Sequence, residues 1–263
     1  MILFVFEGRK REPALFSTIQ TLFFPKDNEH IVCSFGNNIY ELYKELKALD
    51  DDGDIVALLK ERFKNEKNNP FKDLKSADFS EIYLFFDYDF QNNNLSLSLI
   101  NRQIADMLSI FDNETENGKL YINYPMIESI RYTKELPDEQ YHTYTVTQAD
   151  CHQFKHLAGE FSFYKNLNFI ILENNAHKAI TAERLEEVKN NWQHLTDMNV
   201  TKANYLCHNV LSRPALKSDI NQLAIFNAQV EKYVSATPVS IAVLNAFPLF
   251  IYEYFASVNK TGH

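Results

Sequence analysis

The sequence predicts an α/β fold in the first half of the chain and a mainly helical second half. Short runs of β-favouring apolar residues occur at 2–6, 30–35, 81–90 and 119–124, and segments with helical periodicity separate them. Strands that alternate with helices favour a parallel sheet covered on both faces. After about residue 135 this alternation ends and helical spacing dominates. We therefore expect a parallel-sheet domain followed by a mainly α-helical one.

The first strand is expected at 2–6, where an all-apolar run is typical of a strand buried on both faces. Pro13 suits the first turn of a following helix. A second apolar run at 30–35 predicts the next strand. Segments 39–49 and 55–63 then place apolar side chains three and four residues apart, which predicts two amphipathic helices.

Residues 81–90, with the sequence EIYLFFDYDF, are the clearest strand in the chain. A helix around residues 100–110 follows, then a polar loop, and a strand at 119–124 that ends at Pro125. These elements complete the domain that we expect at 1–135.

The second domain, 136–263, is expected to be mainly α-helical. Periodicity cannot decide between a strand and a buried helical turn for NFIILE at 168–173. Helical spacing recurs at 148–160, 178–196 and 217–235.

Composition and charge limit the possible classes of protein. The 263 residues are 45% hydrophobic and 23% charged, which indicates a globular chain of one large or two small domains. A net charge of −9 excludes a strongly basic nucleic-acid binder but not a local basic patch. The three cysteines, Cys33, Cys151 and Cys207, match neither a disulfide framework nor a zinc site, so we expect a reducing, cytoplasmic location.

No membrane contact is expected. The apolar N-terminus is short, lacks a basic leader and runs directly into EGRKRE, so it does not predict a signal peptide. The most apolar stretch, 239–255, is interrupted by Asn245 and Pro248 and closes on Glu253. A membrane span needs about 20 mostly apolar residues, so we predict a buried, kinked pair of helices there.

Two of the predicted strands end in carboxylates. Glu7, followed by a glycine that permits a tight turn, ends the first strand, and Asp87 and Asp89 end the third. Functional groups gather at the carboxyl ends of parallel strands, and strand alternation would put both aspartates on one side. Carboxylates this close repel each other unless one is protonated or a cation bridges them, and hard oxygen ligands suit Mg²⁺ or Mn²⁺. The alternative is that the aspartates only cap the next helix.

This combination resembles the Toprim domain, a Rossmann-like fold. Toprim proteins carry a glutamate, usually followed by glycine, after the first strand and a DxD motif after a later one, and ILFVFEG and YLFFDYD match that order. The resemblance covers about the first half of the chain. Within the family, EGRKREP is similar to the opening of RloB-like and OLD-type (overcoming lysogenization defect) anti-phage nucleases. In those proteins a second acid and a proline or aromatic follow, as Glu12 and Pro13 do here.

The resemblance implies a metal-dependent nuclease of a toxin-like antiviral defence system, acting on DNA or RNA, tRNA included. Asp87 and Asp89 would hold Mg²⁺ (or Mn²⁺) with help from Glu12. Glu7 would act as general acid/base or bind a second metal. Two-metal sites stabilise the attacking and the leaving oxygens of an in-line displacement.

Further candidates concern substrate binding. Three cations after the first strand, Arg9, Lys10 and Arg11, could contact phosphate, the alternative being a solvated turn. RloB-like proteins also have a strand that ends in Asn-Pro with a glutamate nearby. The segment INYPMIES places Glu128 similarly, although Tyr124 stands where the family has asparagine.

The alternatives lead to different partners. The chain has no GxxxxGK[ST] motif, so an ATPase would be a separate partner protein, and the helical half would serve docking, dimerisation or substrate selection. A second hypothesis is a catalytically silent Toprim-fold subunit of such a complex. A third is a phosphatase of the haloacid dehalogenase type with Asp87 as nucleophile and Asp89 as acid/base. That class carries its DxD after the first strand, with Thr or Val where this chain has Gln91.

One other acidic pattern carries less weight. Asp50, Asp52, Asp54 and Glu61 occupy positions 1, 3, 5 and 12 of a calcium loop, but Ile55 stands where that loop needs glycine. We interpret these acids as N-terminal caps of a helix.

Overall fold

The computed structural model describes residues 1–25, 28–49, 53–92, 94–172 and 179–258. Within these ranges, none of the helices combines the length and the apolar character that crossing a membrane requires.

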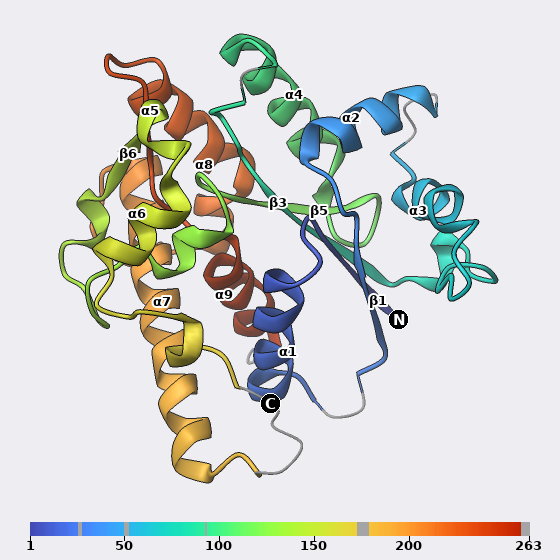
Figure 1. Cartoon of the computed structure of the whole chain (residues 1–263), viewed down its shortest axis with the longest axis horizontal. Coiled ribbons are helices and arrows are strands. Elements are labelled where there is room, and N and C mark those ends of the chain that lie inside the picture. The colour runs from blue at the N-terminus through green and yellow to red at the C-terminus, as the bar shows by residue number, and fades with distance from the viewer. Residues whose placement is uncertain (26–27, 50–52, 93, 173–178, 259–263) are drawn as a thin grey trace.

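The centre of the molecule is a five-stranded sheet (Figure 1). Its strands are β1 (Ile2–Phe6), β2 (His30–Ser34), β3 (Glu81–Asp87), β4 (Asp112–Asn113) and β5 (Gly118–Asn123). They are ordered β2-β1-β3-β5-β4, and all neighbours pair in parallel except β4, a short antiparallel partner of β5 inside the predicted polar loop. The α/β class with a mostly parallel sheet is therefore confirmed. Every residue of β1 is buried, as expected for a strand covered on both faces.

The helices of the first half are α1 (Arg11–Phe23), α2 (Ile39–Ala48), α3 (Ile55–Phe63) and α4 (Leu97–Ile110). Each of them matches a predicted helical segment. The last three begin after residues whose side chains accept a hydrogen bond from a backbone N–H three residues on, namely Asn38, Asp54 and Ser96. Asp54 is thus a helix cap, as we interpreted it. Asp50 and Asp52 lie outside the described residues.

The second half is mainly helical, with one two-stranded antiparallel sheet. Its elements are β6 (Thr145–Thr147), α5 (Gln148–Cys151), α6 (Phe154–Phe161), α7 (Ala182–His208), α8 (Gln222–Gln229), a π-helix (Val230–Val234), β7 (Ser240–Ala242) and α9 (Ala246–Val258). In the undecided segment 168–173, a 3-10 helix ends at Phe169, no strand forms up to residue 172, and Glu173 lies outside the described residues. The 3-10 helices are Ser76–Asp78, Ile127–Arg131, Tyr141–Thr143, Leu167–Phe169 and Lys217–Ile220.

Two predicted elements differ in the structure. β3 ends at Asp87 and not at Phe90, because Asp89 adopts a left-handed backbone conformation, with φ 45°, that a strand does not contain. The stretch 239–255 is strand β7 followed by the single helix α9, so the kinked helix pair was wrong. Its β-branched beginning pairs with β6, and Pro248 fits the first turn of α9, where its missing N–H is not needed.

Aromatic rings fasten the second half to the sheet. Helices α1 and α9 lie on one side of the sheet, and α2, α3 and α4 lie on the other (Figure 1). On the α9 side, the rings of Phe247 and Phe250 lie 4.7 and 5.4 Å from the ring of Phe85. Phe4 packs on Phe16 of α1 at 4.1 Å. One continuous cluster of buried apolar residues therefore covers both halves, and the proposed boundary near residue 135 stays a prediction.

Candidate functional site

The candidate site lies where β1, β3 and β5 end. Glu7 follows β1 directly, Asp87 is the last residue of β3, and Asn123 is the last residue of β5, in register with Asp87. The Glu7 Oε2 accepts a hydrogen bond of 3.0 Å from the backbone N–H of Asp87. The Asp87 Oδ1 accepts one of 2.9 Å from the side-chain amide of Asn123. The three strand ends are therefore joined through polar side chains, as the strand-end argument predicted for Glu7 and Asp87.

Asp89 reaches the site by a different route from the one predicted. It lies beyond the strand, so alternation along β3 does not place it. Its left-handed backbone turns the chain, and its backbone N–H donates to the carbonyl of Pro125 at 3.2 Å. The Asp89 Oδ1 accepts a hydrogen bond of 2.9 Å from Gln91. The negative charge of Asp89 contributes to the raised pKa of Glu7 and to that of Asp87.

The glycine after Glu7 lies close to the carboxylate of Glu12. Glu12 is buried, and its Oε1 accepts a hydrogen bond of 3.0 Å from the backbone N–H of Gly8. A Cβ on Gly8 would lie 2.6 Å from the other oxygen of the same carboxylate, closer than real Cβ contacts occur. Gly8 is not in the left-handed region, so close approach, and not the expected tight turn, explains the glycine.

Burial and mutual repulsion change the acidity of these carboxyl groups. Burial, then the charge of Asp89, raises the pKa of Glu7 well above its usual range. Burial, then the charge of Glu7, does the same to the pKa of Asp87. Burial also raises the pKa of Asp89 and that of Glu12. These four carboxyl groups form what we call the carboxylate cluster, and a bound cation would relieve their repulsion.

The donor atoms of the carboxylate cluster fit a hard cation. In the described part of the chain, Glu7, Asp87 and Asp89 each use one carboxylate oxygen in a hydrogen bond within the protein. Among the same residues, no three His, Cys, Asp or Glu side chains form a ready-made ligand set. Mg²⁺ is commonly held by one or two carboxylates, with water and substrate phosphate completing its shell. The protein would thus supply part of the coordination of such an ion.

The three predicted phosphate-binding residues, Arg9, Lys10 and Arg11, differ in their exposure and in their contacts. Arg9 and Lys10 are exposed, and the Arg9 guanidinium lies over Gly36 at the end of β2. Arg11 forms an ion pair with Glu128, which is only 4% exposed. A role of Glu128 in substrate binding stays a prediction, because the structure shows only how its carboxylate is paired.

The second half of the chain contributes residues that the sequence did not reveal. Lys155 of α6 lies 3.4 Å from the Glu128 Oε1, and Arg131 donates to the Lys155 carbonyl at 3.0 Å. At the start of α5, the Gln148 side chain donates to the Phe90 carbonyl at 2.7 Å, beside the DxD motif. No sequence signal links these residues to the site. Asn123 was also missed, although it could be found as the polar residue that ends the strand next to β3.

Fold and site together define an α/β protein with a partly buried carboxylate cluster at the carboxyl edge of its sheet, in which Asp87 and Glu12 are buried. The arrangement is consistent with a Rossmann-like fold. Comparisons of the chain with protein-family models, with curated proteins and with solved structures found no match. Function is therefore inferred from the residues of the site.

Proposed function

We propose that this protein is a Mg²⁺-dependent nuclease of Toprim type that hydrolyses phosphodiester bonds in DNA or RNA. One observation supports this most: the carboxylate after β1 accepts a hydrogen bond from the DxD motif that ends β3. The two motifs that resemble Toprim thus meet at one edge of the sheet, where α/β proteins bind ligands.

Each residue of the site has a role in this proposal. Asp87 and Asp89 would hold Mg²⁺, which when bound would neutralise charge on the phosphoryl group. Glu7, with Oε2 fixed by the backbone of Asp87, would hold or release a proton at Oε1 or bind a second metal. Asn123 orients Asp87, and Glu12 fixes the backbone at Gly8.

The cations would bind the nucleic-acid backbone. Arg9 and Lys10 are exposed at the edge of the site and can meet phosphate directly. Glu128 holds Arg11 and Lys155 together at the same edge. A toxin-like role in cytoplasmic anti-phage defence, beside a separate ATPase partner, completes the proposal and is supported by the sequence resemblance alone.

The test is a cleavage assay with end-labelled single-stranded DNA, duplex DNA, RNA and tRNA, each with Mg²⁺, Mn²⁺ or EDTA. We expect cleavage of at least one substrate with metal and none with EDTA. Glu7→Gln and Asp87→Asn, which preserve shape, should abolish it. Asp112→Asn, at an exposed residue of β4, is the matched control and should cut like the wild type. Cleavage that survives both site substitutions would contradict the proposal.

A catalytically silent interaction subunit is the second candidate. The observation that favours it is the lack of a ready-made set of three ligating side chains among the described residues. Calorimetry with Mn²⁺ separates the two: a silent subunit binds no metal at the carboxylate cluster and cuts none of the substrates. A nuclease binds the ion and loses that binding in Asp87→Asn.

A further inference from the structure

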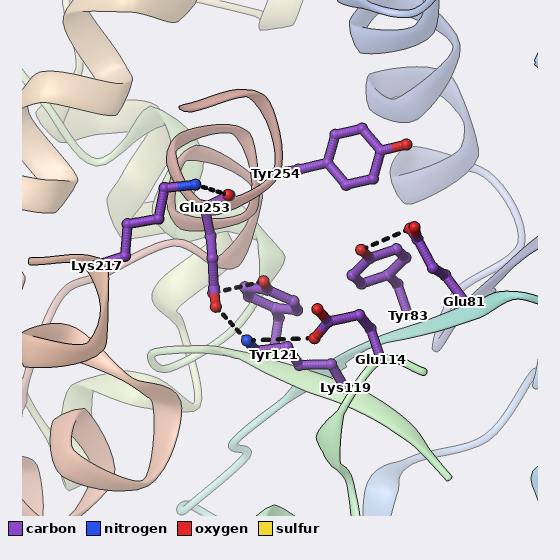
Figure 2. A pocket seen from close by; sticks show the side chains of 8 residues that line it. All are labelled: Glu81, Tyr83, Glu114, Lys119, Tyr121, Lys217, Glu253 and Tyr254. Atoms are coloured by element: carbon purple, nitrogen blue, oxygen red, sulfur yellow. Dashed lines mark hydrogen bonds and ion pairs between the residues drawn. The ribbon is translucent and has the colours of Figure 1, made fainter. Parts of the chain in front are cut away.

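A polar cavity of about 290 Å³ lies at the opposite edge of the sheet from the carboxylate cluster. Glu81, which lines this cavity, is the first residue of β3, whereas Asp87 is the last residue of that strand. Seven residues of strand separate the two edges by about 20 Å. The β4–β5 hairpin and helix α9 supply the other walls (Figure 2). This cavity therefore shares no lining residue with the proposed nuclease site.

Tyrosine rings form the apolar part of this cavity. The ring of Tyr83 lies 5.8 Å from that of Tyr254 at 76°, and 6.4 Å from that of Tyr121. Figure 2 shows the Tyr254 side chain extending from α9 on the same side as Tyr83 and Glu81. An organic cation is attracted by carboxylates and by the faces of aromatic rings, whose quadrupole is negative there.

The two lysines of the cavity are directed toward one glutamate. The Glu253 carboxylate forms an ion pair with Lys119 and accepts a hydrogen bond of 2.7 Å from the hydroxyl of Tyr121. Lys217 donates to the backbone carbonyl of Glu253 (Figure 2). Lys119 is farther from Glu114, at 3.6 Å. The positive charge of the cavity thus gathers around Glu253.

Negative charge is left on the other side of the cavity. Three glutamates line it against two lysines. Glu81 accepts a hydrogen bond of 2.9 Å from the Tyr83 hydroxyl, and the ion pairs of the described residues include none for Glu81. Glu81 and Glu114 both line the cavity beside Tyr83, and after burial their charges raise the pKa of that tyrosine.

We propose that this cavity binds a small linear polyamine. An ammonium group would lie between Glu81 and Glu114, and the methylene chain would pack on the half-buried ring of Tyr254, because Tyr83 is only 5% exposed. The volume is at the lower end of the range of ligand pockets, about 300–1,000 Å³, which suits a diamine or triamine better than a nucleotide. The same ammonium chemistry occurs in a lysine side chain of another protein, so the test must separate the two sources.

The test is calorimetric titration of the full-length protein with putrescine and with spermidine, and separately with N-acetyl-lysine methylamide. We expect saturable binding of one amine per chain, with the diamine or triamine at least tenfold tighter than the lysine analogue. Glu81→Gln and Glu114→Gln should each weaken binding about tenfold, which is about 1.4 kcal/mol, because each removes one negative charge beside the ammonium group. Glu81→Gln retains an acceptor for the Tyr83 hydroxyl, and circular dichroism checks that both variants fold.

Matched controls distinguish this site from general attraction to an acidic protein. Glu116→Gln removes one charge from the same loop as Glu114, at an exposed residue outside the cavity lining, and should bind like the wild type. Equal losses in Glu116→Gln and Glu81→Gln would overturn the proposal, as would tighter binding of the lysine analogue or no binding of either amine. Asp87→Asn should bind the amine normally, so failure of the nuclease proposal leaves this one intact.

Discussion

The acidic side chains at the two edges of the central sheet differ in the groups that pair with them. At the carboxyl edge, Asp87 is buried and Glu7 is half-buried, and their hydrogen-bond donors are an asparagine amide and a backbone N–H. At the amino edge, Glu253 meets Lys119 and a tyrosine hydroxyl. Charges that the protein neutralises itself serve stability, whereas charges buried with neutral donors call for a ligand from outside. The comparison is thus between Glu253, which the protein pairs with a lysine, and Glu7 and Asp87, whose hydrogen-bond donors are neutral.

The largest effect is expected on nuclease turnover, and only from a substitution at the carboxyl edge of the sheet. Asp87→Asn should lower nuclease turnover by about 100-fold or more, because the metal loses a charged ligand while the hydrogen bond to Asn123 can persist. Glu253→Gln should leave turnover within about twofold of the wild type, since it lies at the other edge. Turnover is measured on the substrate found by the cleavage assay. Equal losses of turnover in Asp87→Asn and Glu253→Gln would contradict the proposed difference between the two edges.

The second prediction concerns pH and the metal-free protein. A raised pKa in the folded state means that the folded chain binds more protons than the unfolded chain at pH values above about 4.5. The raised pKa values of Glu7 and Asp87 therefore make the free energy of unfolding fall as pH rises toward and beyond neutrality. The slope is at most about 1.4 kcal/mol per pH unit for each group.

Urea denaturation in EDTA at several pH values between 5 and 8 measures this slope. The double variant Glu7→Gln/Asp87→Asn should be more stable than the wild type at pH 8, and the difference should shrink as pH falls. If the free energies of unfolding of the two proteins changed with pH in parallel, the charges of Glu7 and Asp87 would not destabilise the folded state.

The third prediction is that Mg²⁺ restores part of the stability that this repulsion removes. A ligand that binds only the folded state adds about 1.4 kcal/mol at tenfold its Kd. MgCl₂ at pH 7.5 should thus raise the Tm of the wild type but not that of Asp87→Asn. NaCl of equal ionic strength is the control, and an equal shift in both proteins would indicate binding elsewhere.

The smallest effect is expected at the amino edge. Glu253→Gln should cost about 1 kcal/mol of unfolding free energy, because Lys119 loses its closest counter-charge in a partly exposed pair. Added salt should reduce that difference. Chemical denaturation at low and at high NaCl concentration checks it, and a cost several times larger would contradict the assignment of this ion pair as partly exposed and weak.

The strands were predictable because their signals are local. An apolar run followed by an acid marks both β1 with Glu7 and β3 with Asp87, and neighbouring strands bring such ends together. Strand alternation was expected to position Asp89, but a left-handed turn beyond β3 does so instead, and its role in the site stays a prediction. Local patterns also misjudged 239–255, because pairing with β6, almost 100 residues earlier in the chain, decides that segment. The contact of Lys155 with Glu128 could not be predicted for the same reason, since it depends on tertiary packing alone.

The rings of α9 on the sheet have a consequence for how this chain can be divided or can evolve. Phe247 and Phe250 cover Phe85, so a fragment that stops at residue 135 would expose aromatic surface and would also lose Lys155 from the edge of the site. The halves are therefore not exchangeable modules. A different C-terminal half could be grafted onto this sheet only if it brought its own aromatic cover for the same face.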